Sequence, residues 1–518
     1  MRSDNSGGYS ALRLIFALVF GLFVICVLRA LILFPEPKSP EPCEVSADHQ
    51  PITKEHGIIE RFQEALKIKT VAWDIHSYDT QELIKMRHFI EKNYPTLHSS
   101  SLVKRTIIGN YSLVYEIKGS DPKLKPYMLC AHLDVVPVEQ EKWTVDPFGG
   151  IIKNGYIYGR GAVDVKDALM GILEAVEFEL SRGFKPKRPI ILAFGHDEEV
   201  TGIDGAVQIA NFLVSKKVEL EFLLDEGTCI LKNAFPGIPK EQVALISVAE
   251  KGYLTVEVSI EDKPRHSSTP PYEPNIVTLS KALAKFNSRA HKSMFGYGTE
   301  NSFFESLAPH AQFPYKVLFG NLWLFGPLVS YMMSLSPMGN ALVRTTSAVT
   351  VVKGGVKDNI ISSEASALIN HRIHPAQTIA EVVEYDRQLI NDDKIKISIK
   401  QGSEPTPPSP HGDNIFGYAS IKQSIQQVFP DAIVVSGLMI AGTDARHYTA
   451  LSPNLYRFTP LYIPSEDIIL FHGHDERISV ENYVKAVNFY HHLILAADRS
   501  ELPKPRVRDE ILKENERS

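Results

Sequence analysis

The chain has 518 residues, which is more than one ordinary hydrophobic core holds, so we expect at least two folded domains. Its apolar content of 44% and charged content of 22% are typical of a globular protein and exclude a largely disordered chain. A net charge of −6 offers no basic surface, and the sequence contains no nucleic-acid-binding motif. We therefore expect no nucleic acid partner.

Residues 1–35 differ in composition from the rest of the chain. Residues 14–28 are an apolar run, and after Arg29 the run resumes to residue 34, which together is about the length of one membrane-spanning helix. Arg2 and Arg13 precede the run, which predicts a cytosolic N-terminus and a lumenal or extracellular body. A cleaved signal peptide is the alternative and would give a secreted protein. We interpret the segment as a signal anchor of the secretory pathway, because it lacks a small-x-small cleavage site, and residues 36–53 as a Pro-rich stalk.

Cysteine content and one sequence motif bear on the compartment. Four cysteines are too few for a disulfide scaffold, and we expect buried free thiols, with the stalk cysteine exposed. The segment Asn110-Tyr111-Ser112 is an N-glycosylation sequon, which is relevant if the body is lumenal. The cysteines are Cys26, Cys43, Cys130 and Cys229.

Residues 54–248 alternate between helical and strand patterns. Short, fully apolar strands separated by helices predict an α/β domain with a mainly parallel sheet and helices on both faces. We regard this segment as the first part of a catalytic domain. The expected helices lie at 58–66 and 168–180, and the expected strands at 112–117, 127–131, 190–194 and 222–224.

The pattern changes near residue 249. Residues 253–260 alternate between apolar and polar side chains, as expected of a half-exposed strand. We interpret residues 249–375 as an inserted α+β lid and dimerisation domain, residues 376–500 as the second part of the catalytic domain, and residues 501–518 as a polar tail. Further strands are expected at 347–352 and 365–373, and further helices at 275–286, 379–389 and 415–428.

Within the insertion, residues 317–343 contain no charged side chain. Asn321, Gly326, Pro327 and Pro337 interrupt the stretch, which disfavours a second transmembrane helix. Ordinary core is the main interpretation, and an apolar patch for a lipid-like substrate or a membrane surface is the alternative.

Histidine and acidic side chains follow several of the expected strands and a Gly-rich turn. Because the carboxyl ends of parallel strands meet at one edge of a sheet, these side chains could share a site. Each motif alone is also explained by a helix cap or a solvated turn, but their coincidence favours a metal centre, since zinc binds histidine and carboxylate and activates water. The candidates are His132 with Asp134, Asp164, Glu198 with Glu199, Asp225, and His472 or His474.

Local chemistry suggests roles for some of these residues. His132 would ligate a metal, and Asp134 would accept the other ring N–H and fix its orientation. Four ionisable groups follow the strand at 190–194 directly. Their removal from water costs free energy unless charged partners or a metal ion stabilise them. We assign Glu199 to the metal and Glu198 as the general base.

Taken together, the motifs resemble those of the dizinc peptidase and amidohydrolase family of aminoacylase and carboxypeptidase S. The resemblance covers residues 55–498, and the motifs are specific in combination. They are AHLDVVP at 131–137, GRGAVDVK at 159–166, DEE at 197–199, DEG at 225–227, HSS at 266–268, GTDAR at 442–446 and HGHDE at 472–476.

The resemblance implies two Zn²⁺ ions with Asp164 between them. His132 and Asp225 would each join one ion, and Glu199 and His472 would complete the ligand shells. It favours His472 over His474, which local reasoning left open, because the ligand opens the His-x-x-Asp-Glu pattern.

The resemblance also implies roles outside the metal ligands. Glu198 would shuttle the proton, and His266 of the inserted domain would reach the active site of a partner subunit, which implies a homodimer. Asn359 and Arg446 would contact the substrate, and Arg446 would hold its carboxylate.

Stretches 323–325 and 344–346 are similar to those of family members that act on N-fatty-acyl amino acids. The expected activity is hydrolysis and reversible formation of that amide, with an N-acyl amino acid, or a fatty acid plus an amino acid, as substrate. A metallocarboxypeptidase or dipeptidase is one alternative. A catalytically inactive binding ectodomain is another, although intact Glu198 and Asp164 argue against it.

Overall fold

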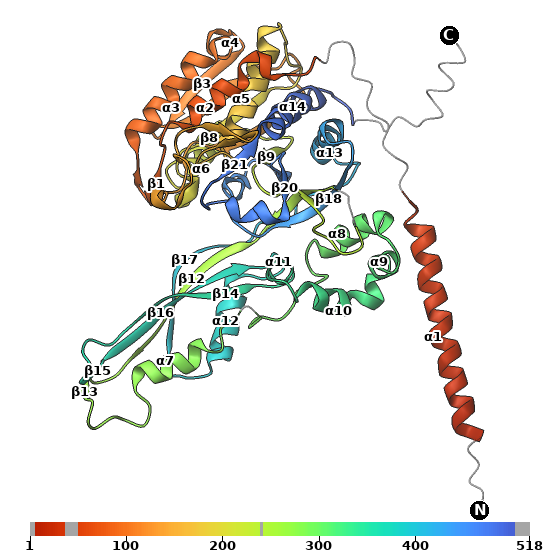
Figure 1. Cartoon of the computed structure of the whole chain (residues 1–518), viewed down its shortest axis with the longest axis vertical. Helices are drawn as coiled ribbons and strands as arrows, with labels where there is room; N and C mark the ends of the chain where they lie inside the picture. Colours follow the sequence, from red (N-terminus) through yellow and green to blue (C-terminus); the bar gives the residue numbers. More distant parts are fainter. Residues whose placement is uncertain (1–5, 37–49, 239–241, 288, 503–518) are drawn as a thin grey trace, which may run out of the picture. The chain divides into compact units, whose positions relative to one another are not determined.

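The structure is a computed structural model of the chain and describes residues 6–36, 50–238, 242–287 and 289–502 (Figure 1). Cys43, most of the expected stalk and most of the polar tail lie outside the described residues. The chain forms two compact units. The α/β unit comprises residues 40–232, 241–253 and 403–518, and the inserted unit comprises residues 1–39, 233–240 and 254–402.

The boundary of the insertion differs from the one we expected. The inserted unit extends to residue 402 rather than to residue 375. Helix α12 (Ile379–Ile390) contributes Val382 and Val383 to the core of that unit, and strand β17 (Lys396–Ser403) joins its sheet. Both elements therefore belong to the insertion.

A ten-stranded mixed sheet forms the centre of the α/β unit, in the order β20-β10-β11-β19-β9-β5-β8-β4-β3, with β18 also paired to β11. Its middle strands β19, β9, β5 and β8 are parallel to one another, whereas β4 is antiparallel to both of its neighbours, β8 and β3. The strands are β3 (Val103–Ile108), β4 (Ser112–Ile117), β5 (Tyr127–His132), β8 (Ile190–Gly195), β9 (Leu223–Asp225), β10 (Ile230–Lys232), β11 (Gln242–Glu250), β18 (Ala432–Met439), β19 (Leu455–Arg457) and β20 (Tyr462–Pro464).

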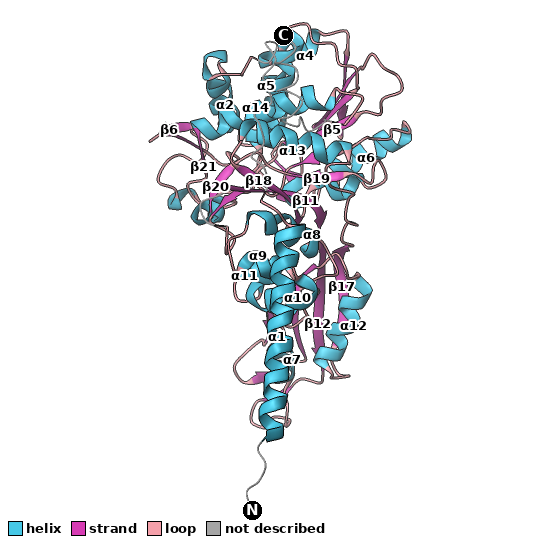
Figure 2. Ribbon diagram, turned by 90° about the vertical axis from the view of Figure 1, so that its right-hand side faces the viewer, coloured by secondary structure: helices cyan, strands magenta, loops and turns pink. Residues whose placement is uncertain are grey.

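Helices cover both faces of this sheet, as the sequence predicts (Figure 2). Successive strand side chains point to opposite faces, so Leu129 and Ala131 of β5 join one core cluster while Met128 and Cys130 join another. The first cluster includes α2 (Ile58–Leu66), α3 (Thr80–Asn93), α4 (Pro95–Ser99), α5 (Lys166–Ser181), α13 (Phe416–Val428) and α14 (Val480–Ala497), and the second includes α6 (Ala206–Ser215) and the 3₁₀ helix η5 (Asp444–Tyr448).

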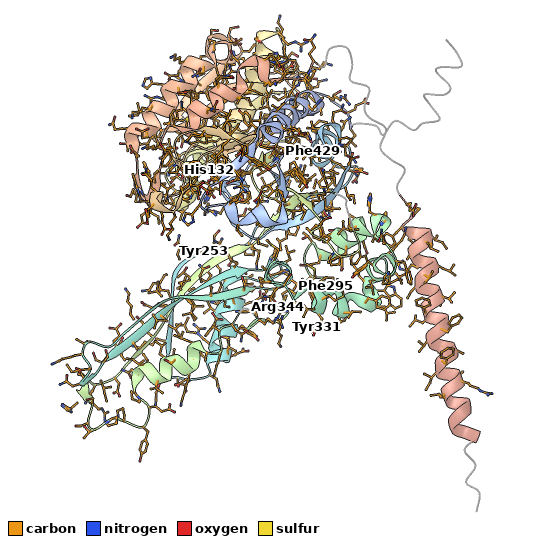
Figure 3. All side chains as sticks on the ribbon, viewed as in Figure 1. His132, Tyr253, Phe295, Tyr331, Arg344 and Phe429 are labelled. Carbon is orange, nitrogen blue, oxygen red and sulfur yellow. The ribbon has the colours of Figure 1, made fainter. Side chains whose placement is uncertain are left out.

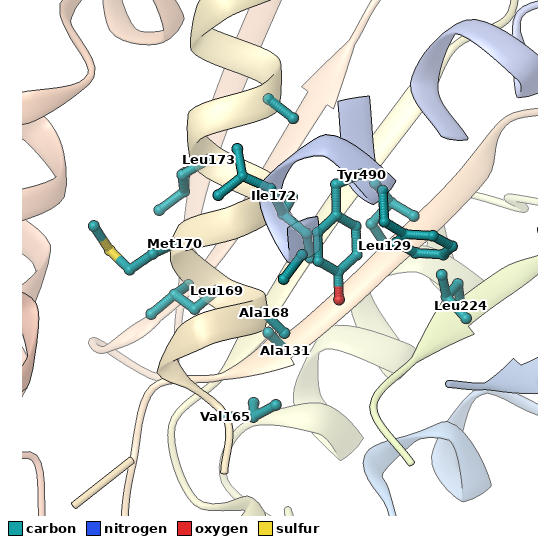
Figure 4. Close-up of a cluster of buried hydrophobic side chains, with 14 of the residues drawn as sticks. Leu129, Ala131, Val165, Ala168, Leu169, Met170, Ile172, Leu173, Leu224 and Tyr490 are labelled. Atoms are coloured by element: carbon teal, nitrogen blue, oxygen red, sulfur yellow. The ribbon is translucent and has the colours of Figure 1, made fainter. Parts of the chain in front are cut away.

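Helix α5 packs against the sheet, and Figure 4 shows its side chains beside Leu129 and Leu224 of the strands and Tyr490 of α14. Gly171 allows α14 to approach, since a Cβ there would lie 3.0 Å from the Tyr490 ring. The core on both sides of α5 therefore fixes its N-terminus, and the turn that contains Asp164 directly precedes it.

A smaller sheet connects two motifs that are far apart in the sequence. Strand β21 (Arg477–Ser479) pairs antiparallel with β7 (Tyr156–Tyr158), which pairs with β6 (Ile151–Lys153). Arg477 lies opposite Tyr158 in this register. The pairing brings residues 472–476 beside the Gly-rich turn at 159–164. A further two-stranded sheet joins β1 (Ala72–Asp74) to β2 (Ser77–Tyr78).

The inserted unit is an α+β structure, as expected. Its sheet has the order β14-β16-β12-β17, and Val256, Val258 and Ile260 of β12 are buried alternately with half-exposed neighbours. A two-stranded sheet joins β13 to β15. The elements are β12 (Gly252–Glu261), β13 (Arg265–His266), α7 (Asn275–Leu283), β14 (Thr346–Gly354), β15 (Ile360–Ile361) and β16 (Glu364–Ile373).

The uncharged stretch 317–343 forms short helices rather than a single membrane span. Trp323, Leu328 and Tyr331 of α10 are exposed, and Tyr331 is labelled in Figure 3. The stretch is therefore partly core and partly exposed, and a role of the exposed side chains toward lipid stays a prediction. The helices of this region are α8 (Glu300–Leu307), α9 (Tyr315–Phe319), α10 (Leu322–Met333) and α11 (Pro337–Leu342).

Among the described residues, α1 (Ser6–Leu33) is the one helix long and apolar enough to cross a membrane, over Leu12–Leu33. Part of it contacts α9: Cys26 and Ala30 are buried against Val317, and the Asn321 side chain donates a 2.9 Å hydrogen bond to the Cys26 carbonyl. Cys26, Cys130 and Cys229 are buried free thiols, as expected.

Candidate metal centre

The carboxyl ends of three neighbouring parallel strands supply most of the candidate ligands. His132 ends β5, Glu198 and Glu199 begin the 3₁₀ helix that follows β8, and Asp225 ends β9 with Glu226 directly after it. Parallel strands present their carboxyl ends at the same edge of a sheet. The sheet therefore gathers side chains that are up to 94 positions apart in the sequence.

Asp164 lies between two imidazoles. Its Oδ1 atom is 3.2 Å from Nε2 of His132, and its Oδ2 atom is 2.9 Å from Nε2 of His472. Nε2 of His472 also lies 3.1 Å from Oε2 of Glu199. Each carboxylate oxygen of Asp164 thus faces a different histidine, an arrangement that suits a carboxylate shared by two cations.

Glu226 completes this group on the His132 side. Its Oε1 atom is 3.4 Å from Nε2 of His132, and His132, Glu198 and Glu226 form one candidate group of metal ligands. The carboxylate of Asp225 instead accepts hydrogen bonds from the backbone N–H groups of Glu226 at 2.9 Å and Ala445 at 2.7 Å. Among the described candidate groups, Glu226 is present and Asp225 is not.

Asp134 anchors the loop that carries the two glutamates. Its carboxylate accepts hydrogen bonds from the backbone N–H groups of Glu198 at 3.2 Å and Glu199 at 3.1 Å. The ring Nδ1–H of His132 donates to the carbonyl oxygen of Asp134 at 2.9 Å, and the Asp134 carboxylate lies 3.5 Å from the same nitrogen. This contact leaves Nε2 of His132 free to face Asp164.

A buried ion pair holds the two loops that meet at Asp164. Arg160 Nη1 donates to Glu476 at 2.6 Å, and Arg160 Nη2 donates to the carbonyl oxygens of His472 at 3.1 Å and Gly473 at 3.0 Å. Glu476 also accepts the backbone N–H of Val163 at 2.8 Å. These two residues position Asp164 and His472 without being candidate ligands themselves. Neither residue was predicted to have a role, although both stand within the sequence motifs.

Several carboxyl groups are buried together in the centre, which makes their ionised forms costly. Burial raises the pKa of Glu198 well above its usual range, that of Glu199 to about 7 and that of Glu226 to about 8. A hydrogen bond to Asp164, reinforced by one to Glu199, raises the pKa of His472 to about 10. Buried carboxylates in this number require cations close to them.

The donor set fits a zinc centre. Histidine nitrogens and carboxylate oxygens are the ligands of hydrolytic zinc sites. Oε1 of Glu199 is buried and has no hydrogen-bond partner among the described side chains and backbone, so a ligand-type oxygen is available there. The side chain of His472 is 52% exposed, so the centre is also open to solvent on that side.

Arg446 lies in η5 of the same unit. Its Nη2 atom donates to the carbonyl oxygen of Thr201 at 3.1 Å. Burial opposes its charge, but nearby carboxylates, with Glu198 first among them, raise the pKa of Arg446. The guanidinium is therefore charged and electrostatically coupled to Glu198.

His266 and Asn359 lie together in the inserted unit. Strand β13 pairs with β15, and the backbone N–H of Ser267 donates to the carbonyl oxygen of Asn359 at 3.1 Å. Both residues are exposed, and Nδ1 of His266 lies 2.8 Å from the Ser268 hydroxyl oxygen. His474 is also exposed and contacts Glu139 at 3.1 Å instead of the candidate ligands.

An α/β unit with histidines and carboxylates at the carboxyl ends of its parallel strands, and with an α+β insertion, defines a metallopeptidase-type protein. The chain belongs to the peptidase family M20/M25/M40, whose model matches residues 128–496. The resemblance expected from the motifs is therefore confirmed. Membership of this family implies that the centre holds a metal ion.

Three relatives show the level of similarity. N-fatty-acyl-amino acid synthase/hydrolase PM20D1 of Mus musculus is 42% identical over 454 residues, covering 88% of this chain and 90% of the relative. The protein of that name from Homo sapiens is 37% identical over 492 residues, covering 92% and 98%. Probable carboxypeptidase S-like 2 of Dictyostelium discoideum is 38% identical over 488 residues, covering 92% of each.

Solved structures share the fold. The M20 family metallo-carboxypeptidase Sso-CP2 from Sulfolobus solfataricus matches with a TM-score of 0.63 and 17% identity, covering 86% of this chain and 99% of that one. Human carnosine dipeptidase 1 matches with a TM-score of 0.59 and 15% identity, covering 86% and 96%. The expected fold class, an α/β domain with an inserted α+β domain, is thus confirmed.

Proposed function

We propose that the protein is a zinc-dependent amidohydrolase that cleaves, and reversibly forms, the amide bond of N-fatty-acyl amino acids. The observation that carries the reaction class is the position of Asp164, whose two oxygens face His132 and His472 at 3.2 and 2.9 Å. The substrate class is supported by the names of relatives that are 37 and 42% identical to this chain.

We assign two Zn²⁺ ions to the centre. Asp164 would lie between them, with His132 and Glu226 on one side and Glu199 and His472 on the other. Glu226 replaces Asp225 in this assignment, because backbone amides occupy the carboxylate of Asp225. When bound, zinc ions polarise a carbonyl group and lower the pKa of water.

Glu198 is the proposed proton carrier. It takes a proton from the attacking water as the carbon–oxygen bond forms, and gives it to the amide nitrogen as the carbon–nitrogen bond breaks. Burial raises the pKa of Glu198, which allows its carboxyl group to hold that proton between the two steps. Asp134 keeps the carboxylate in place through the backbone N–H of Glu198.

Arg446 is proposed to pair with the carboxylate of the amino-acid product, where its planar guanidinium can form two parallel hydrogen bonds. The family resemblance assigns His266 to the oxyanion, supplied by the inserted unit of a second copy in a homodimer, and Asn359 to the substrate. The adjacent positions of these two residues on β13 and before β15 support a joint role.

Condensation of a free fatty acid with an amino acid uses the same groups in reverse, because one barrier serves both directions. Glu198 then takes a proton from the attacking amine and gives it to the departing oxygen as water forms. Substrate and product concentrations determine the net direction.

The second candidate is a metallocarboxypeptidase or dipeptidase, which is favoured by the 38% identity to a probable carboxypeptidase S-like protein. Purified protein loaded with zinc is assayed on an N-oleoyl amino acid and on an N-blocked dipeptide. A higher kcat/KM for the N-oleoyl amino acid supports the first function, and a higher value for the dipeptide supports the second. Bound zinc with no turnover of either substrate would support a binding protein and reject both.

We also propose a membrane-anchored protein of the secretory pathway with its body on the lumenal or extracellular side. The apolar helix at Leu12–Leu33 and the exposed side chain of Asn110 support this topology. The exposed apolar side chains of α10 are proposed to face lipid or an acyl chain. Cell expression tests the topology: glycosidase treatment should reduce the mass of the wild type and leave Asn110→Gln unchanged.

A further inference from the structure

A second cluster of metal-binding residue types lies in the inserted unit. His291 follows α7, His371 belongs to β16 and Asp386 belongs to α12. Their ligand atoms lie within 4.8 Å of one another, and all three side chains are at most 1% exposed. The proposed amide chemistry uses none of them.

Two of these residues occupy positions where the local pattern calls for an apolar side chain. On β16, His371 is in line with Ala367, Ile369 and Ile373, which form the apolar core of the unit. On α12, Asp386 lies one turn after Val382 and one turn before Ile390 on the buried face. Polar groups at such positions lose their hydration and need a specific partner.

The contacts within the cluster are close without being hydrogen bonds. Nε2 of His371 lies 3.0 Å from Oδ2 of Asp386, and Nε2 of His291 lies 3.4 Å from Oδ1. None of these four atoms has a hydrogen-bond partner in the described part of the chain. Ligands bound to zinc at 2.0–2.1 Å in a tetrahedron are about 3.3–3.4 Å apart. The distances of 3.0 and 3.4 Å in the cluster are close to this spacing.

The surroundings hold the imidazoles in place. Nδ1 of His371 is 3.1 Å from the hydroxyl oxygen of Ser347, which leaves Nε2 directed toward Asp386. The Tyr385 hydroxyl donates to the carbonyl oxygen of Ala290 at 3.0 Å, and Arg344 donates to that of His291 at 2.9 Å. The backbone on both sides of the His291 ring is therefore anchored before any ion binds.

We propose that His291, His371 and Asp386 bind one Zn²⁺ ion with a structural role. Two neutral imidazoles and one carboxylate match the nitrogen and oxygen donors that zinc accepts, and a water molecule would supply the fourth ligand. The ion would also balance the charge of the Asp386 carboxylate, which is fully buried.

The ion would connect three parts of the inserted unit that are distant in the sequence. His371 and Asp386 join the sheet to α12, and His291 adds the segment that leads from α7 to α8. A zinc ion in this place would order that segment and, with it, the helices α8 to α11. Loss of zinc would loosen these helices while leaving the sheet of the α/β unit intact.

Metal content tests the proposal directly. Native mass spectrometry and elemental analysis of the full chain, purified and equilibrated with Zn²⁺, should show one more zinc per chain in the wild type than in His371→Gln or Asp386→Asn. Asp164→Asn is the matched control, because it affects the centre of the α/β unit and should retain the additional ion. Equal zinc content in the wild type and in His371→Gln would overturn the proposal and identify a buried ion pair instead.

A milder variant covers the case in which removal of a ligand prevents folding. Ser347→Ala keeps all three ligands and removes the contact that orients His371. In competition with a chromophoric chelator, its affinity for the additional zinc should be about 10–100-fold weaker than that of the wild type. Cobalt in place of zinc should give visible absorption for this ion in the wild type. The site would be rejected if Ser347→Ala bound zinc as tightly as the wild type and the cobalt spectrum of the wild type matched that of His371→Gln.

Discussion

The two histidine and carboxylate clusters of this protein use the same residue types in different settings. In the α/β unit, the centre around Asp164 lies where parallel strands end, and the side chain of His472 is 52% exposed. In the inserted unit, none of His291, His371 and Asp386 is more than 1% exposed. A hydrolytic site must admit water and substrate, whereas a structural site can be closed on all sides.

The two clusters also differ in the number of carboxylates that they contain. The centre around Asp164 contains four buried or nearly buried carboxylates, so it favours more than one divalent cation and keeps a surplus group for proton transfer. The closed cluster has one carboxylate for two imidazoles, which suits a single ion. Access and surplus charge, rather than ligand type, separate the catalytic proposal from the structural one. The four carboxylates are Asp164, Glu198, Glu199 and Glu226.

The largest effect is expected for Glu198→Gln, which removes the surplus group. We expect kcat for an N-oleoyl amino acid to fall by about 10³–10⁴-fold, because the amide side chain cannot carry the proton. Zinc content should stay the same, since the metal ligands remain. Steady-state assays and elemental analysis of one preparation measure both quantities.

Glu219→Gln is the matched control for this substitution. Glu219 is exposed and pairs with Lys125 on the surface of the same unit, so its variant should show wild-type kcat. Near-normal turnover in Glu198→Gln would reject Glu198 as the proton carrier, and loss of zinc in that variant would instead make it a ligand.

The second prediction separates Glu226 from Asp225. Glu226→Gln should weaken zinc binding by about 100-fold, because it replaces a carboxylate that faces His132 with a poorer ligand. Asp225→Asn should weaken it by less than about tenfold, since the amide oxygen can still accept one of the two backbone hydrogen bonds. Chelator competition ranks the two variants, and the reverse order would restore Asp225 as the ligand.

The candidate centre could be predicted from the sequence because its main signal is local. An apolar strand that ends in His132, or in the acidic residues after residue 194, requires only strand periodicity and the rule that parallel strands end at one edge. The structure links His132 to Asp164, Asp164 to His472 and His472 to Glu199 by successive contacts of 3.2, 2.9 and 3.1 Å. The choice of His472 over His474 came from the family resemblance and not from any local pattern.

Other features depend on packing that a single sequence does not encode locally. Asp225 and Glu226 are neighbours, and which one faces His132 is decided by the direction of the backbone as β9 ends beside η5. The boundary of the insertion depends on α12 and β17 joining a sheet whose other strands lie earlier in the chain. The pairing of Arg160 with Glu476 spans 316 positions and was not expected.

The third prediction concerns that pairing. Glu476→Gln breaks a fully buried ion pair and should destabilise the protein by about 3–5 kcal/mol. It should also weaken zinc binding by about 10–100-fold, because Asp164 and His472 lose the group that aligns their loops. Glu481→Gln, which breaks an exposed pair with Lys485, should change stability by less than about 1 kcal/mol. Denaturant unfolding compares the two, and similar losses would contradict a positioning role.

The fourth prediction is a pH dependence of zinc binding at the centre around Asp164. Zinc must displace protons from its ligands, and without metal the pKa of His472 is raised to about 10 by Asp164 while burial raises the pKa of Glu199 to about 7. Between these values one proton leaves per ion bound at His472, so zinc affinity should rise about tenfold per pH unit above pH 7 and more steeply below it. His472→Gln should flatten this slope, whereas His474→Gln should not, because His474 contacts Glu139 instead. Chelator competition from pH 6 to 9 measures the slope, and an affinity that falls as pH rises would show that the ligand protonation states are assigned incorrectly.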